Sequence, residues 1–272
     1  MTGFEQFIKS ISWTMETPGN YGIFHLISVA SAILLTVLLC VFFKNSSSKV
    51  FRTIVLVGWL LMVVFEIAKQ LVFSYTFEND IVSTSYSWYA FPYQLCSTPI
   101  YLLPFVVFLK DGKVRDAIMS FISTFALFGG LVVFIYPNDV FVGLTIVNIQ
   151  TMLHHGLQIV LGIYFMVYNR KKLNIKYFLS SIVVFAIMSA IAILLNFVIH
   201  NYVTTETFNM FYISPYFPQH LPILSTVYAL VPYIVYLITY LLGFTLASYL
   251  LYLIQFGIIR LCTRGKNKNA VA

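Results

Sequence analysis

Seven separate stretches of about 20 apolar residues limit what this chain can fold into, because a helix of that length crosses roughly 30 Å of hydrocarbon. The stretches are Ile23–Phe43, Thr53–Phe73, Phe91–Leu109, Ala117–Tyr136, Thr145–Tyr168, Tyr177–Ile199 and Pro232–Ile259. Hydrophobic residues make up 60% of the 272 residues and charged residues only 9%. Such a chain has too few polar side chains to cover a soluble core. The sequence therefore predicts an all-α, polytopic membrane helix bundle with seven transmembrane helices.

The last apolar stretch is longer than a single span requires. Apolar character begins upstream near Leu221, and Pro222 and Pro232 interrupt it. We interpret Tyr212–Ala229 as a proline-containing re-entrant or interfacial segment that leads into the seventh span. A bundle of six spans, with this end of the chain divided differently, is the alternative.

The distribution of Lys and Arg predicts the orientation of the bundle. Fourteen of the sixteen basic residues fall between spans 1 and 2, 3 and 4, 5 and 6, or after span 7. The opposite segments carry acidic residues, among them Asp80 and Asp139, with Lys9 as their one basic residue. We therefore expect the N-terminus outside, and the C-terminus and Lys171 inside.

This topology divides the chain into three parts. Residues 1–21 form an extracellular interfacial segment, with a short helix that ends at Pro18-Gly19. Residues 22–259 form the seven-span domain, and residues 260–272 form a basic cytoplasmic tail. The net charge of +7 is explained by topology signals at the span ends, so we expect membrane lipids and no nucleic acid as partners. The expected location is the cell membrane, and protein partners stay open.

Polar side chains inside the predicted spans are candidates for function, because each costs about 2.5–3.5 kcal/mol to insert when charged. They are Glu66, Lys69 and Gln70 in span 2, Gln94 and Cys96 at the start of span 3, Asn148, Gln150, His154, His155 and Gln158 in span 5, and Asn196 in span 6. At 1.5 Å per helical residue, Glu66, Cys96 and His155 lie about 12, 8 and 15 Å below the outer surface. All three are thus expected in the outer half of the bundle.

Cys96, His155 and Glu66 could supply a nucleophile, a base and a group that orients the base. A thiol needs a base or a positive neighbour to become a reactive thiolate, imidazole is the usual base, and a carboxylate can orient it. Cysteine is equally an ordinary packing residue in membrane helices. Both roles for Cys96 stay open at this point.

Glu66 and Lys69 are three residues apart, so they share a helix face and are expected to pair. The pair could have a purely structural role, or the pair as a whole, rather than Glu66 alone, could be the partner of His155. His154 and His155 point about 100° apart on a helix, which makes a two-histidine metal site improbable. We expect no metal and no cofactor, since the sequence holds no phosphate-binding, nucleophile-elbow or zinc-binding motif.

Three segments carry a resemblance to a known family. They are VVFEIAKQLVF, which contains Glu66, FPYQLCSTPIYLLP at 91–104, and TMLHHGLQIVLGIYF at 151–165. Over roughly residues 20–260 the chain resembles the YwaF family of bacterial integral membrane proteins. That family is similar to eukaryotic transmembrane protein 164, a phospholipid acyltransferase, and more distantly to the androgen-induced-gene class of membrane hydrolases.

The resemblance implies acyl transfer through a thioester on Cys96, with His155 as the base. Bacterial members often carry a histidine where this chain has Gln94, which cannot titrate but could donate a hydrogen bond to an oxyanion. The supporting set is Gln94, His154, Lys69, Gln70, Asn148 and Gln158. The resulting hypothesis is a lipid acyltransferase, or a lipid ester or thioester hydrolase, with a Cys–His pair inside the bundle. The alternatives are a non-catalytic binding or transport protein for a small amphiphile, and a structural membrane subunit.

Overall fold

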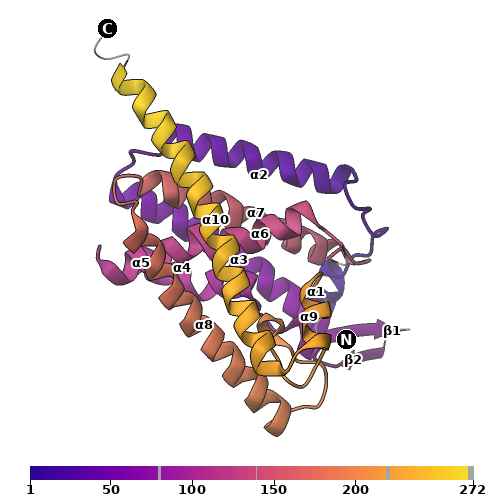
Figure 1. The fold of residues 1–272 in the computed structure, drawn as a ribbon. Coiled ribbons are helices and arrows are strands. Elements are labelled where there is room, and N and C mark those ends of the chain that lie inside the picture. Colours follow the sequence, from indigo (N-terminus) through magenta and orange to yellow (C-terminus); the bar gives the residue numbers. More distant parts are fainter. Residues whose placement is uncertain (79–80, 139, 219–220, 269–272) are drawn as a thin grey trace.

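The computed structural model describes residues 1–78, 81–138, 140–218 and 221–268 (Figure 1). Asp80 and Asp139, which we expect outside the membrane, lie outside these described residues. Among the described residues, five helices are long and apolar enough to cross a membrane. They are α2 (Ile23–Phe42), α3 (Ser48–Ser74), the continuous helix Lys113–Ile135, α8 (Ile175–Tyr202) and α10 (Tyr233–Lys268). The chain is therefore a multi-pass helical membrane protein.

The helix Lys113–Ile135 consists of three parts: α5 (Lys113–Phe121), a π-helical turn η3 (Ile122–Ala126) and α6 (Leu127–Ile135). The π turn lies against Gly162 of a neighbouring helix. A Cβ at Gly162 would come within 2.9 Å of the Leu127 Cβ and 3.0 Å of the Ile122 carbonyl oxygen. The absence of a side chain at Gly162 therefore allows the widened turn to approach the neighbouring backbone.

The third and fifth predicted spans differ from the other five. The third consists of η2 (Leu95–Ser97) and α4 (Thr98–Phe108), which together rise only about 21 Å. Residues 91–94, which we expected to be helical, are not, and Pro92 lies among them. The fifth is α7 (Thr145–Tyr168), with the bounds that the sequence predicts.

The prolines of α4 leave two backbone carbonyl groups without their usual N–H donor, and side chains donate to these carbonyls instead. Pro99 and Pro104 have no N–H to donate to the carbonyls four residues before them. The Thr98 hydroxyl donates to Leu95 O at 2.7 Å, and the Trp59 indole of α3 donates to Ile100 O at 2.8 Å. The unusual helix start next to Cys96 is thereby fixed to α3.

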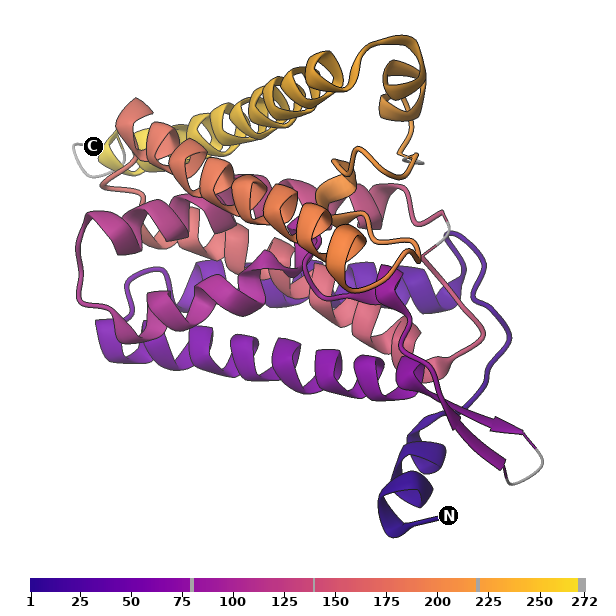
Figure 2. The same ribbon diagram turned by 90° about the horizontal axis from the view of Figure 1, so that it is seen from below.

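Helix α7 is surrounded by the other helices. It packs against α2, α3, α6 and η3, and most of its side chains are buried, including His154 and Gln158. In Figure 2, α3 and α10 lie on opposite sides of the bundle with α7 between them. A helix covered by protein does not need an apolar surface, so its polar residues are compatible with this position.

Several short elements project from one end of the bundle (Figure 2). They are α1 (Gly3–Ile11) and the antiparallel strands β1 (Tyr75–Glu78) and β2 (Ile81–Thr84). The 3₁₀ turn η1 (Trp88–Ala90) follows the hairpin and packs on the buried Phe208. The hairpin is a small departure from the all-α prediction. The N-terminal helix ends at Ile11 and not at Pro18-Gly19 as we expected, because the chain turns at Ser12 and pairs with residues 143–145 through Trp13 and Met15.

Residues 208–218 and 221–230 differ in how deeply they are buried. The 3₁₀ turn η4 (Met210–Tyr212) is buried, whereas α9 (Leu224–Leu230) has no buried side chain. The part that enters the core therefore lies upstream of most of the predicted segment Tyr212–Ala229. Phe211 and Tyr212 both have positive φ, at 58° and 57°, a conformation that costs L-residues roughly 1–2 kcal/mol each.

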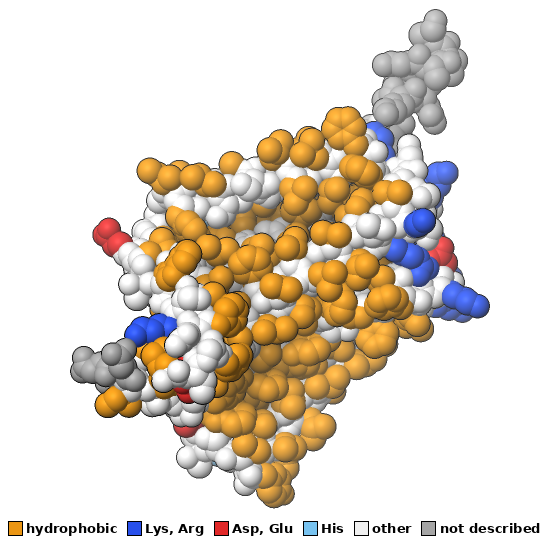
Figure 3. Space-filling model, turned by 180° about the vertical axis from the view of Figure 1, so that it is seen from behind, with side chains coloured by type: hydrophobic (Ala, Val, Ile, Leu, Met, Phe, Trp, Pro, Cys, Tyr) orange, Lys and Arg blue, Asp and Glu red, His pale blue; other side chains and the backbone are white. Residues whose placement is uncertain are grey.

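Charge and hydrophobicity separate clearly on the surface. Lys and Arg side chains gather at one end of the molecule and hydrophobic side chains cover the flank (Figure 3). Helix α1 and the end of α10 lie at opposite ends of the bundle (Figure 1). An odd number of membrane crossings would produce that arrangement.

Candidate functional site

A buried ion pair lies in the second half of α3. Glu66 is 6% exposed, and its Oε1 is 2.7 Å from the Nζ of Lys69. Gln70 Nε2 donates to the same oxygen at 2.7 Å, and Gln150 Nε2 of α7 donates to Oε2 at 2.8 Å. Both carboxylate oxygens thus have partners, which offsets the cost of burying the charge. The expected Glu66–Lys69 pair is present, but the α7 residue that reaches Glu66 is Gln150 and not a histidine.

Gln70 connects this ion pair to the segment that follows the hairpin. Its Nε2 donates to Ala90 O at 2.8 Å, and the Tyr86 hydroxyl donates to its Oε1 at 3.0 Å. Burial raises the pKa of Tyr86, and the negative charge of Glu66 raises it further. The phenol therefore stays protonated and remains a donor. The set Glu66, Lys69, Gln70, Gln150 and Tyr86, called the ion-pair cluster below, ties α3, α7 and this loop together.

Two side chains of α7 hold the backbone of Cys96. His154 Nε2 lies 2.8 Å from the Cys96 carbonyl oxygen, and Gln158 Nε2 donates to the same oxygen. A carbonyl only accepts, so His154 Nε2 carries the proton and Nδ1 is left as an acceptor. His154, rather than His155, is therefore the histidine that contacts Cys96, and it contacts the backbone and not the thiol.

His155 has a free ring nitrogen. Its Nδ1 donates to Thr151 O at 2.7 Å, which leaves Nε2 as an acceptor, and that atom is buried without a partner among the described residues. Cys96 and His155 are partly exposed, while the chain neighbours of each are buried: Leu95, Ser97, His154 and Gly156. Both residues therefore retain some exposed surface, although the Nε2 of His155 is itself buried.

Three acceptors on one turn of α7 lack donors in the described part of the chain. They are His154 Nδ1, His155 Nε2 and Gln158 Oε1. A buried polar atom without a hydrogen bond costs about 1–3 kcal/mol. The turn from His154 to Gln158, called the histidine turn below, can thus accept hydrogen bonds that no described residue donates.

Helix α6 packs tightly against the histidine turn through two glycines. A Cβ at Gly130 would lie 2.9 Å from His155 O and 3.0 Å from the Gln158 Cβ, and one at Gly129 would lie 3.9 Å from the Cys96 Cβ. A side chain at Gly130 would therefore displace α7. This contact brings α6, α7 and η2 together around Cys96.

Gln94 and Asn196 hold the buried segment at η4. Gln94 Nε2 donates to Asn209 O at 2.9 Å and its Oε1 accepts from Phe211 N at 2.8 Å. Asn196 makes the same two-way contact with the backbone of Met210, at 3.0 and 2.7 Å. These bonds maintain the left-handed backbone at Phe211. The Gln94 amide is therefore held by η4, and only its second N–H remains for a role as an oxyanion donor.

The other expected site residues are distributed as follows. Asn148 bonds the backbone N and O of Val142, at 2.9 and 2.7 Å, and so holds the segment before α7. Among the described residues, no hydrogen bond joins Glu66 to His155. Within those same residues, no group of three or more His, Cys, Asp or Glu side chains could hold a metal ion.

Gln150 is among the polar residues that we expected in the fifth span, but we assigned it neither to the catalytic nor to the supporting set. It is four residues from His154 and eight from Gln158, so the three share one face of α7. That spacing was readable in the sequence. The partner of that face was not, since the sequence does not state how α7 is rotated relative to α3.

Comparison with known proteins identifies one family. The TMEM164 family matches residues 20–252. Neither the curated proteins nor the solved structures contain a match.

Proposed function

Because the chain belongs to the TMEM164 family, we propose that this membrane protein transfers or hydrolyses an acyl group of a membrane lipid through Cys96. One observation carries the proposal: the Cys96 backbone is fixed to the histidine turn, where His155 Nε2 is free to accept a proton. Cys96 and His155 are both partly exposed among buried neighbours, which suits residues that must meet a substrate.

The proposed topology has seven spans in the cell membrane, with the N-terminus outside and the C-terminus inside. It adds α4 and α7 to the five apolar helices. Support comes from the gathering of basic side chains at one end and from α1 and the end of α10 lying at opposite ends (Figures 1 and 3). Cys96 and His155 then lie in the outer half of the bundle, where an acyl chain could enter sideways from the lipid.

The proposed reaction has two balanced steps. His155 Nε2 takes the thiol proton, and the Cys96 sulfur attacks the carbonyl carbon of a lipid ester. The C–S bond forms, the ester C–O bond breaks, and the leaving lipid hydroxyl receives the proton from the imidazolium. A second hydroxyl, from water or another lipid, then attacks the thioester and gives its proton to His155. The C–S bond breaks, and the imidazolium returns the proton to the sulfur, which restores the thiol.

The remaining polar residues have positioning roles in this proposal. His154 and Gln158 hold Cys96, and the ion-pair cluster fixes α3 against α7. Glu66 then acts as a structural residue, because its carboxylate is occupied by Lys69 and two amides.

Trapping of the acyl-enzyme tests the proposal directly. The purified full chain is incubated in phosphatidylcholine vesicles with labelled acyl chains, quenched in acid and examined by mass spectrometry. We expect one hydroxylamine-sensitive acyl group on Cys96, its loss in Cys96→Ser, and its retention in the matched controls Cys40→Ser and Cys262→Ser. Lipid transport or binding with no acyl group on Cys96 would instead establish the non-catalytic alternative.

A further inference from the structure

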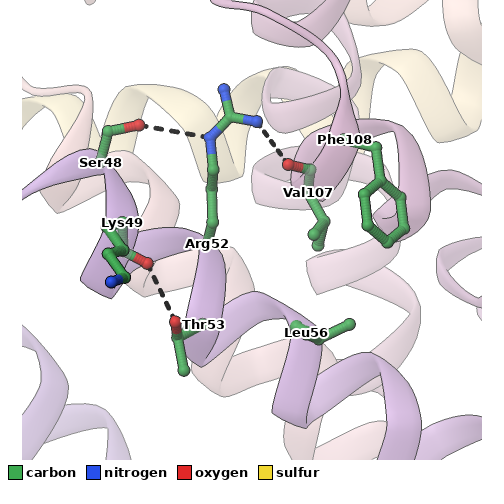
Figure 4. A pocket seen from close by; sticks show the side chains of 7 residues that line it. All are labelled: Ser48, Lys49, Arg52, Thr53, Leu56, Val107 and Phe108. Atoms are coloured by element: carbon green, nitrogen blue, oxygen red, sulfur yellow. Dashed lines mark hydrogen bonds between the residues drawn. The ribbon is translucent and has the colours of Figure 1, made fainter.

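A groove lies between the first turns of α3 and the last turn of α4, far from Cys96 (Figure 4). Its volume is about 460 Å³, within the range of small-molecule sites. It is lined by Ser48, Lys49, Arg52, Thr53, Leu56, Val107 and Phe108. Lys49 and Glu66 are 17 residues apart on one helix, which places the groove about 25 Å from the ion-pair cluster.

One side of the groove is cationic. Arg52 extends from α3 toward α4, where its guanidinium donates to Val107 O, and its Nε donates to Ser48 Oγ at 3.3 Å (Figure 4). Its other nitrogen is 3.5 Å from Asp111, a carboxylate that also pairs with Arg115. Lys49 is exposed. Arg52 and Arg115 thus share one carboxylate, and Lys49 lies one turn before Arg52 on α3, so the charges near the groove sum to a positive value.

The other side of the groove is apolar and continues onto the flank of the bundle. Leu56 and Phe108 face each other across the groove (Figure 4), and Phe108 is 69% exposed. Beyond Leu56, the outer face of α3 exposes Val57, Leu60 and Val64, at 52, 45 and 59%. A ligand in this groove would therefore meet positive charge at the end of the bundle and an apolar surface along its side.

We propose that the groove binds an anionic glycerophospholipid from the leaflet at the basic end of the bundle. Its phosphate lies between Lys49 and Arg52, and one acyl chain follows Leu56 and Phe108. Two cations beside one phosphate favour a lipid with net negative charge over a zwitterionic one. The site is separate from Cys96 and requires no catalytic activity.

Lipid retention measures this binding. The full chain, purified in detergent, is titrated with phosphatidylglycerol or phosphatidylcholine, and bound lipid is counted by native mass spectrometry. Lys49→Gln should weaken phosphatidylglycerol binding about five-fold, whereas Lys171→Gln, an exposed lysine at the same end, should leave it unchanged. Thr53→Trp, which fills the groove and keeps both cations, should also weaken it.

The outcomes separate the possible ligands. Equal retention in Lys49→Gln and Lys171→Gln would overturn the proposal, as would equal affinity for the two lipids. Full displacement by inorganic phosphate, with no effect of Thr53→Trp, would show that the groove binds free phosphate and not a lipid. Arg52 is left unchanged in these variants, because it also holds the end of α4.

Discussion

The ion-pair cluster and the histidine turn are both buried and polar, and they differ in how completely their hydrogen bonds are satisfied. Glu66 has Lys69, Gln70 and Gln150 around its two oxygens. Four residues further along α7 than Gln150, acceptors begin to lack donors, and His154 Nδ1 and His155 Nε2 have none in the described structure. The same helix thus supplies a complete network at one turn and an incomplete one at the next.

This difference distinguishes polar residues that hold helices together from polar residues that can bind a ligand. A complete network cannot accept a ligand without first losing a bond, so the ion-pair cluster suits a role in holding helices together. An incomplete network already bears the cost of its free acceptors and gains when a hydroxyl or thiol group supplies a donor. In the proposed function, the strongly charged region is therefore the support and the histidine turn is the reactive part.

The largest expected effect comes from His155→Gln. The variant keeps a polar side chain and removes the base, so acyl transfer should fall about 10³-fold while the unfolding temperature stays the same. Turnover in labelled vesicles measures it. The matched control is His200→Gln, which changes a histidine in the last turn of α8 that stacks on Tyr216, and it should keep full activity. Unchanged turnover in His155→Gln would remove His155 from the mechanism.

Glu66→Gln should act on stability. The change leaves the Lys69 ammonium buried without its counter-charge, which should cost about 3 kcal/mol of unfolding free energy. Turnover per folded molecule should not change. Denaturation in detergent, with activity normalised to folded protein, tests both parts. Lost turnover at full stability would mean that Glu66 acts on His155 after all.

Gly130→Ala tests the close contact behind the histidine turn. The new methyl group would collide with His155 O and the Gln158 Cβ, and overpacking of this kind costs about 2 kcal/mol. Turnover should fall as well, since α7 must move. Gly243→Ala on α10, where a Cβ meets nothing within 4 Å, should be neutral or slightly stabilising. Equal unfolding temperatures of the two variants would contradict the contact.

Gln150→Leu should have the smallest effect of the series. It removes one donor to the Glu66 carboxylate, which retains Lys69 and Gln70, so the expected cost is about 1.5 kcal/mol. The loss should disappear in a Glu66→Gln background if Gln150 stabilises the protein through that charge. A double-mutant cycle on unfolding free energies measures the coupling. Independent, additive effects would show that Gln150 acts elsewhere.

The helix boundaries were largely predictable because apolar runs end at basic or proline-containing loops. α7 begins and ends where the sequence indicates, and α2 differs by one residue. The π turn at Ile122–Ala126 and the hairpin at 75–84 were not predictable. They depend on contacts with distant segments, such as the approach of Gly162 to the π turn.

The sequence indicated which polar residues belong to the candidate site, but not which of them contact one another. The free-energy cost of placing ionisable side chains inside a membrane span is enough to identify Glu66, His154 and His155 as candidates. Which of them meet depends on the rotation of each helix about its axis. Because α7 is covered by other helices, its apolar residues do not gather on one side, and the sequence does not indicate that rotation. The sequence therefore predicts the Glu66–Lys69 pair, which is local, but neither the contact of Gln150 with Glu66 nor that of His154 with the Cys96 carbonyl.

Turnover of the double variant Glu66→Gln/Lys69→Met tests the central claim most directly, because it removes both buried charges and leaves the histidine turn intact. If the ion-pair cluster is only a support, the unfolding free energy should return to within about 1 kcal/mol of the wild type. Turnover per folded molecule should equal that of the wild type, whereas His155→Gln remains inactive. A folded double variant that is as inactive as His155→Gln would contradict the account.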